Sequence, residues 1–306
     1  MSRRSPGQAR VGPAPLAPRP KKSLAQHFLK DRRALARIVS AAELSADDIV
    51  IEVGPGRGVL TRELAARAQR VIAVEIDAAL CQALERDLAS AGNVTIVHRD
   101  ILQTEVPSLL AHLRRGPAPP YKVVANIPYY ITGPILRFFL EAAHKPSRLV
   151  LLVQKEVAQS IVAGPGQMGI LAVSVQLYGR PRIVGTVPAR AFHPPPRVDS
   201  AVLRIDVHDR PAAGVRDTDM FFRVVRAGFS SPRKQLRNAL ANGLRIALED
   251  SARLLAEAQI DATRRAETLS LEEWARLADI VRRDVEARRM AGLVTYSAAQ
   301  PGGFPP

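Results

Sequence analysis

The strongest constraint on the fold is a buried strand that leads through a glycine-rich turn into a helix. Residues 49–53, Ile-Val-Ile-Glu-Val, form a β-branched run typical of such a strand. Gly-Pro-Gly-Arg-Gly follows at 54–58, and apolar residues then recur at helical spacing from Leu60 to Ala68. Glycines let a backbone approach a ligand closely, and a helix start offers unpaired N–H groups. This order of elements predicts a nucleotide site in an α/β fold.

The spacing of the glycines bears on the kind of nucleotide. A dinucleotide fingerprint requires glycines at 54, 56 and 59, but this chain has Val59 and a third glycine at 58, which disfavours an NAD-dependent enzyme. A second strand, expected at 71–74, ends at Glu75, about 20 residues past the glycines, where a carboxylate can accept both hydroxyls of a ribose. The alternative is a surface acid, but the glycine turn at this distance favours the ribose.

A third expected strand, at 94–97, is followed by another acid, Asp100. On the same sheet edge as Glu75, this carboxylate can accept a hydrogen bond from the amino group of an adenine. It can equally cap a helix that begins near Ile101. The residues alone leave both roles open.

The fourth expected strand, at 121–125, ends in Asn126-Ile127-Pro128-Tyr129. The Asn side chain and a carbonyl of the Pro-fixed turn offer two acceptors at a set angle, and the Tyr offers a flat stacking face. That trio suits a planar base with an exocyclic amine. A common Asn-x-Pro turn without this role is the alternative. Because α/β folds bind ligands at the carboxyl edge of the sheet, we expect the chemistry there.

The rest of the chain predicts more of the α/β domain and then a helical one. Strands are expected at 148–153, 182–187 and 201–207, with a proline-stiffened loop at 192–200. From 220 onward the apolar residues follow helical spacing. The expected organisation is a disordered basic arm at 1–22, an α/β domain at 23–207, a linker at 208–219, a helical domain at 220–290 and a flexible tail at 291–306.

The charge of the chain favours a polyanionic partner. Lys and Arg number 44 and Asp and Glu 29, a net charge of +15, and nucleic acid is the first candidate. No acid occurs from 223 to 248, where Arg233 and Arg237 are expected one helical turn apart with Lys234 beside them. We take these three residues and Arg223 as candidate RNA-binding residues. A solvated helix face is the alternative.

The cysteine count and the hydropathy of the sequence indicate the cellular environment in which the protein works. Cys81 is the only cysteine, so neither an intramolecular disulfide nor a multi-cysteine zinc site can form, and we expect no metal. No apolar run approaches the roughly 18 residues of a membrane span. None near the N-terminus has the form of a signal peptide. We expect a cytoplasmic monomer without a membrane partner.

Together the motifs resemble those of the ribosomal RNA adenine N6,N6-dimethyltransferase family, and within it the enzymes that modify two adjacent adenosines near the 3′ end of small-subunit (16S) rRNA. The matching segments are 26–29, 52–58, 75–77, Asp100, 126–129, 192–200 and 233–238. The resemblance implies a Rossmann-like S-adenosylmethionine-dependent methyltransferase domain followed by a small all-α domain. It also implies small-subunit rRNA or a small-subunit precursor as the partner.

The resemblance further implies a role for each matched residue. The cofactor S-adenosylmethionine would be held by His27, Leu29, Gly54, Gly56, Glu75 at the ribose, Asp100 at the adenine amine and Asn126 at the methionine end. The target base would be held by Asn126, Pro128 and Tyr129, with Phe192 on its other side. Position 27 is often Asn in this family, so His27 is a departure.

Two other functions stay open. The large-subunit rRNA methyltransferases of antibiotic resistance share the glycine turn and the target-base motif, although 198–200 and 233–238 look more like the small-subunit enzymes. A non-catalytic RNA-binding assembly factor on the same scaffold is the second alternative. Intact Asn126 and Tyr129 argue against it.

Overall fold

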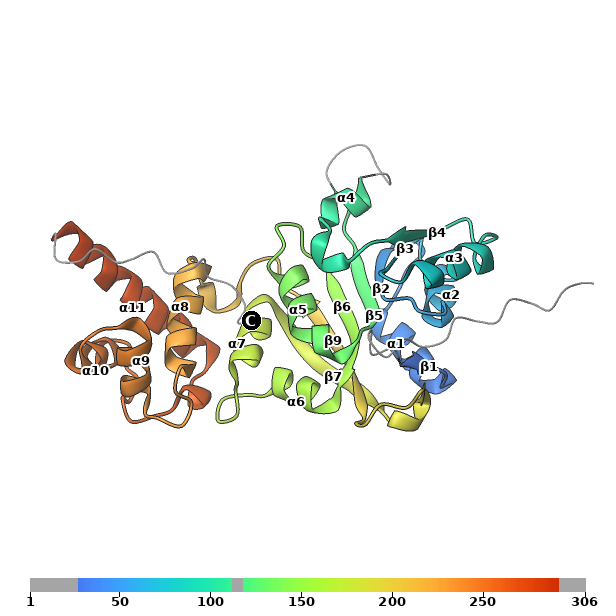
Figure 1. The fold of residues 1–306 in the computed structure, drawn as a ribbon. Coiled ribbons are helices and arrows are strands. Elements are labelled where there is room, and N and C mark those ends of the chain that lie inside the picture. Colours follow the sequence, from blue (N-terminus) through green and yellow to red (C-terminus); the bar gives the residue numbers. More distant parts are fainter. Residues whose placement is uncertain (1–26, 112–117, 292–306) are drawn as a thin grey trace, which may run out of the picture.

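The computed structural model describes residues 27–111 and 118–291 (Figure 1). The predicted arm at 1–22, Gln26 of the first matched motif, and 292–306 of the predicted tail lie outside these ranges. Within them, a mixed sheet occupies the middle of the molecule and a group of helices lies at one end of it. The predicted α/β class with a helical C-terminal region is confirmed.

The sheet has seven strands in the order β4-β3-β2-β5-β6-β9-β7. Their bounds are β2 Ile49–Val53, β3 Arg70–Glu75, β4 Val94–His98, β5 Lys122–Asn126, β6 Arg148–Gln154, β7 Gly179–Val187 and β9 Ser200–Val207. Neighbouring strands from β4 to β6 are parallel, whereas β9 is antiparallel to both β6 and β7. The strand order reverses between β2 and β5, and α/β sheets bind ligands outside the carboxyl ends at such a switch point.

All the expected strands are present, and the largest shift is at β7, which begins at Gly179 instead of Arg182. Gly-Arg-Pro is typical of a turn, so the sequence predicts a shorter strand. The structure extends it because a Cβ on Gly179 would lie 2.6 Å from Ile205 on β9, a distance that only glycine permits. Pro181 is tolerated because β7 is an edge strand.

Helices cover both faces of the sheet. One face packs against α1 (Arg32–Ala42) and α2 (Val59–Ala65). The other packs against α4 (Val106–Leu110), α5 (Thr132–Leu140), α6 (Lys155–Val162) and α7 (Ile170–Tyr178), while α3 (Ala78–Asp87) lies beside β3 and β4. Side chains alternate across a strand, so Ile49, Ile51 and Val53 join the second core and Val50 the first.

The C-terminal helices pack around a buried tryptophan. They are α8 (Thr218–Phe229), α9 (Leu236–Leu244), α10 (Leu248–Glu257) and α11 (Leu271–Met290). Trp274 is fully buried, and a Cβ on Gly228 would lie 2.4 Å from its ring, so α8 and α11 approach closely only because that residue is glycine. Tyr178 of α7 and Phe222 of α8 place their ring centroids 6.1 Å apart. One apolar core therefore continues from the sheet into these helices.

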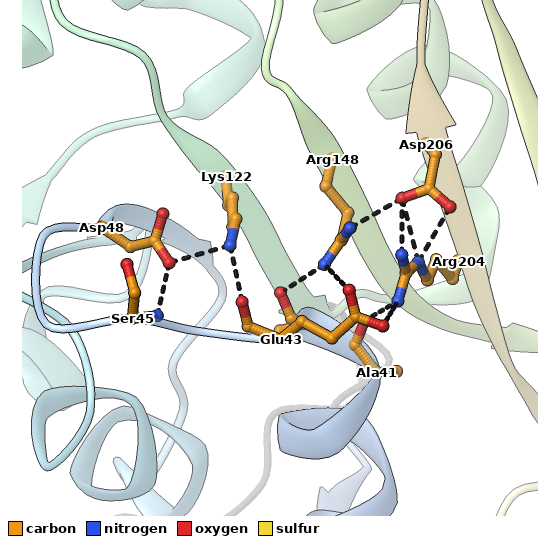
Figure 2. Close-up of polar contacts among 9 residues, drawn as sticks. Ala41, Glu43, Ser45, Asp48, Lys122, Arg148, Arg204 and Asp206 are labelled. Atoms are coloured by element: carbon orange, nitrogen blue, oxygen red, sulfur yellow. Dashed lines mark hydrogen bonds and ion pairs between the residues drawn. The ribbon is translucent and has the colours of Figure 1, made fainter.

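A group of ion pairs, here named the polar clamp, fixes the end of α1 to the sheet (Figure 2). Three cations donate to successive carbonyls at that end: Arg204 to Ala41 at 3.1 Å, Arg148 to Ala42 at 2.9 Å and Lys122 to Glu43 at 2.7 Å. The Glu43 carboxylate pairs with both arginines, and both also pair with Asp206. Hydrogen bonding to Arg204 lowers the pKa of Glu43. Because α1 has no basic residue in its last turn, the clamp caps it from outside.

Candidate active site

A cavity of about 360 Å³ opens at the carboxyl edge of the sheet, beside β2 and β5. Ten residues predicted for the cofactor and the target base line it: His27, Leu29, Gly54, Gly56, Glu75, Asp100, Asn126, Pro128, Tyr129 and Phe192. They come from segments up to 165 positions apart, so the fold brings together what the sequence shows only as separate motifs.

The glycine turn forms the floor of the cavity and packs beneath β1 (Phe28–Leu29). Gly54 and Gly56 have φ values of 66° and 58°, which side chains other than glycine rarely adopt. A Cβ on Gly56 would lie 3.0 Å from the Phe28 ring, and the Arg57 guanidinium carbon lies 4.7 Å from the centroid of the same ring. The turn thus holds β1 by close packing and a cation–π contact.

Glu75 is held by the backbone. One carboxylate oxygen accepts from the N–H of Gly56 at 3.2 Å, and the other accepts from Ile76 at 2.9 Å and Asp77 at 3.0 Å. Burial raises the pKa of Glu75, and these three hydrogen bonds oppose the rise. A carboxylate has about four lone-pair sites, so it can accept a further hydrogen bond from a ligand.

The structure shows one of the two roles that the sequence leaves open for Asp100. Its Oδ1 accepts from the N–H of Leu102 at 3.0 Å and caps the 3₁₀ turn Ile101–Gln103, so the capping prediction is confirmed. The residue also lines the cavity, where its second oxygen is a candidate acceptor. A cap engages one oxygen only, and the two roles are compatible.

Glu52 is a cavity residue to which the sequence analysis gives no role. It is 1 % exposed, and within the described ranges its Oε2 is buried without a hydrogen-bond partner. Burial, with a smaller contribution from the charge of Glu75, raises its pKa to about 8. The signal in the sequence is the acid inside an otherwise apolar strand that ends in glycines. A buried carboxyl oxygen without a hydrogen-bond partner is suited to a cationic ligand group.

The predicted target-base motif, residues 126–129, is held by three hydrogen bonds. The Asn126 side-chain amide donates to the carbonyl of His27 at 3.2 Å, which orients its oxygen as an acceptor. The carbonyl of Pro128 accepts from the N–H of Ile131 at 3.1 Å and keeps a second lone pair. The Tyr129 hydroxyl lies 2.7 Å from the Ser200 hydroxyl, and burial raises the pKa of this tyrosine. The motif therefore has a fixed geometry before a ligand binds.

The segment at 192–200 is not wholly a loop as predicted, because Phe192–His193 forms a strand, β8, antiparallel to β1. The ring nitrogen Nδ1 of His27 donates to the carbonyl of Pro194 at 2.7 Å. The His27 ring also stacks beside Tyr129, with centroids 6.2 Å apart and planes at 23°. Two-residue strands carry no periodicity, so this pairing has no sequence signal.

The candidate RNA-binding residues lie on the helical unit, apart from the residues that line the cavity. Arg223 is half-buried on α8, and Arg233 and Lys234 are exposed in the turn before α9. The expectation that Arg233 and Arg237 lie one helical turn apart is wrong, because α9 begins at Leu236. The N–H of Leu236 donates to the carbonyl of Arg264 at 2.7 Å, a tertiary contact that the local sequence does not reveal.

Within the described part of the chain, none of the helices combines the length and apolar character needed to cross a membrane. No group of three or more His, Cys, Asp or Glu residues among 27–111 and 118–291 is arranged to hold a metal ion.

Known proteins resemble this chain in both sequence and fold. The family model for "Ribosomal RNA adenine dimethylase" matches residues 18–282. "Ribosomal RNA small subunit methyltransferase A" of Dehalococcoides mccartyi is 50% identical over 258 residues, 84% of this chain and 87% of the relative. The protein of the same name from Moorella thermoacetica is 47% identical over 263 residues, 84% of this chain and 90% of the relative.

Among solved structures, the 23S rRNA methyltransferase ErmE is 29% identical with a TM-score of 0.65, and the match covers 83% of this chain and 99% of ErmE. A dimethyladenosine transferase from Plasmodium falciparum has a TM-score of 0.70 at 23% identity, covering 91% of this chain and 100% of the other. At that identity the second likeness is one of fold.

Proposed function

This chain belongs to the ribosomal RNA adenine dimethylase family, and from that premise we propose that it dimethylates the N6 amines of two adjacent adenosines near the 3′ end of small-subunit (16S) rRNA. Relatives of up to 50% identity over most of the chain carry the small-subunit name. The observation that carries the proposal is a cavity lined both by Glu75, the acid expected at the ribose, and by the Asn126-to-Tyr129 motif.

The residues of the cavity fit S-adenosylmethionine as the cofactor, which supplies an electrophilic methyl group on a sulfonium when bound. Glu75 would accept from the ribose hydroxyls, Asp100 from the adenine amine, and Asn126 would contact the methionine end. The unpaired Oε2 of Glu52 suits a positively charged group of the ligand. His27, Leu29 and the positive-φ glycines at 54 and 56 would complete the wall.

The chain activates the target by orienting it. The lone pair of an adenine amine is delocalised into the ring, which makes the amine a weak nucleophile. Hydrogen bonds from N6–H to the Asn126 amide oxygen and the Pro128 carbonyl favour a pyramidal nitrogen whose lone pair points in one direction. Tyr129 and Phe192 hold the base, which must leave its stack to enter. Once methylated, the nitrogen is acidic enough to lose its proton to water, so no general base is required.

The RNA would extend from the cavity onto the helical unit. Arg223, Arg233, Lys234 and Arg237 lie in a stretch without acids and would contact phosphates. We propose that the natural substrate is a small ribosomal subunit precursor, that the enzyme acts as a monomer, and that it works in the cytoplasm.

Replacing Asn126 with Ala tests the base-acceptor role. Loss of one positioned polar group costs about 100-fold or more in rate, and RNA affinity should survive. Asn242→Ala, an exposed asparagine on α9, is the matched control. Methyl transfer from labelled S-adenosylmethionine and filter binding of RNA are measured side by side. Equal loss of transfer and RNA affinity would rule out a role for Asn126 at the base.

The runner-up substrate is large-subunit rRNA, favoured by the likeness to ErmE at 29% identity. Incubating the enzyme with both ribosomal subunits decides between them, because nucleoside analysis locates dimethyladenosine in one RNA or the other.

A further inference from the structure

One aromatic side chain at the mouth of the cavity has no role in the proposed mechanism. Tyr130 is 62% exposed, and it is the one exposed Phe, Trp or Tyr among residues 27–111 and 118–291. It also lines the cavity that holds the target-base motif. An exposed ring of this size contributes little to the core and is accessible to a ligand in the cavity.

The backbone on both sides of Tyr130 is fixed. The residue lies in the 3₁₀ turn Tyr129–Ile131, where the N–H of Ile131 donates to the Pro128 carbonyl at 3.1 Å. The Thr132 hydroxyl donates to the Tyr129 carbonyl at 3.0 Å, and Ile131 packs against the core. A rigid turn thus carries Tyr130 directly after Tyr129, whose ring would stack on the target base.

The chemistry of the proposed RNA substrate indicates which ligand group would contact the Tyr130 ring. An adenosine that leaves its stack exposes one face of the neighbouring base, and bases in single-stranded RNA commonly stack on aromatic side chains. Arg57 and Arg99 also line the cavity, together with the acids Glu52, Glu75 and Asp100, and the two arginines are the lining groups that can contact an RNA phosphate. Aromatic rings and basic side chains lining one cavity are the usual composition of a single-strand RNA path.

We propose that Tyr130 is a stacking platform for the nucleotide next to the target adenosine, an inference that rests on the proposed function. The turn that carries the ring is fixed by its hydrogen bonds, so the ring meets the neighbour on one side only, either 5′ or 3′. With two adjacent targets, that neighbour is the other target adenosine in one of the two modifications and an outer nucleotide in the other. Tyr130 therefore acts unequally on the two adenosines.

The test compares Tyr130→Ala, Tyr130→Leu and Tyr130→Phe on unmethylated small ribosomal subunits. Tyr130→Ala should lower kcat/KM for subunits by about 5- to 150-fold, equivalent to the ~1 to 3 kcal/mol of one base–aromatic stack. Tyr130→Leu keeps apolar bulk but lacks a π face and should behave like Ala, while Tyr130→Phe should stay within about twofold of wild type. Met290→Ala, an exposed apolar residue on α11, is the control.

Two further readouts separate stacking from other causes. The Kd of S-adenosylmethionine, measured by calorimetry, should be unchanged in Tyr130→Ala, as should the melting temperature. Primer extension should show one adenosine losing more methylation than the other. A proportional loss of cofactor affinity, a Leu variant equal to Phe, or full activity of the Ala variant would each overturn the inference. Failure of the wild type to methylate subunits would instead overturn the proposed function.

Discussion

Replacing Glu52 with Gln should stabilise the free protein and remove a large part of its pH dependence. Glu52 is 1% exposed in the core of β2, and its Oε2 has no hydrogen-bond partner among the described residues. Burial raises its pKa from 4.5 to about 8, with the Thr61 side chain opposing the rise and the charge of Glu75 adding a smaller one. Gln has nearly the shape of the protonated acid and carries no charge, so the variant isolates the cost of ionising this carboxyl.

The sign follows from the direction of the shift. An acid whose pKa is higher in the folded state binds its proton more tightly there, so its contribution to stability is complete below about pH 4.5 and is lost as the pH rises through about 8. Across that window the free energy of unfolding falls by about 1 kcal/mol per pH unit from this group alone. The full window corresponds to several kcal/mol as an upper bound.

Urea denaturation of wild type and Glu52→Gln at several pH values between about 5 and 8 measures the difference directly. The variant should match wild type near pH 5 and become progressively more stable than it toward pH 8. Glu105→Gln, an exposed acid outside the cavity, controls for the loss of one negative charge. A difference between wild type and Glu52→Gln that stays constant with pH would refute the reasoning. The same variant should bind S-adenosylmethionine more weakly, because Gln, unlike Glu52, cannot give up a proton on binding and become the counter-charge of a cationic ligand group.

Three other predictions concern separate parts of the molecule. Ser200→Ala and Tyr129→Phe each break the same hydrogen bond, which is worth about 1 kcal/mol. Each variant should therefore lower kcat/KM about fivefold, and the double variant should lose no more than either single variant. Additive losses would mean that the two hydroxyls act separately. Arg204→Met breaks the polar clamp and should lower the free energy of unfolding measured by urea denaturation. The pKa values of its acidic partners are lowered, so the contribution of the clamp is present above their ordinary pKa values and is lost as the pH falls through the lowered ones. Replacing Arg233 and Lys234 together with Ala should reduce the slope of log affinity for RNA against log salt by about 1 to 2, and an unchanged slope would remove this turn from the RNA surface.

The parallel part of the sheet and most of the cavity could be predicted because their signals are local. Continuous apolar runs located β2 to β6, and the glycines before α2 indicated where the backbone turns under a ligand. Strand ends of parallel strands share one edge, so the acids at 75 and 100 and the amide at 126 were expected together, and the cavity lining confirms that they are.

The features that escaped prediction depend on contacts between distant segments. The residues paired between β1 and β8 are at least 163 positions apart in the sequence. Each of these strands has two residues, which is too short to show any periodicity. The start of α9 is set by the carbonyl of Arg264, not by the local Pro-Arg-Lys sequence. The orphaned carboxyl of Glu52 becomes apparent only when the neighbours of its side chain are known.

The central claim is tested most directly by incubating the purified protein with labelled S-adenosylmethionine and unmethylated small ribosomal subunits, with large-subunit RNA in parallel, followed by nucleoside analysis. The account predicts N6,N6-dimethyladenosine in the small-subunit RNA alone, at two adjacent adenosines near its 3′ end. Label confined to the large-subunit RNA, or tight RNA binding with no methyl transfer to either, would contradict it.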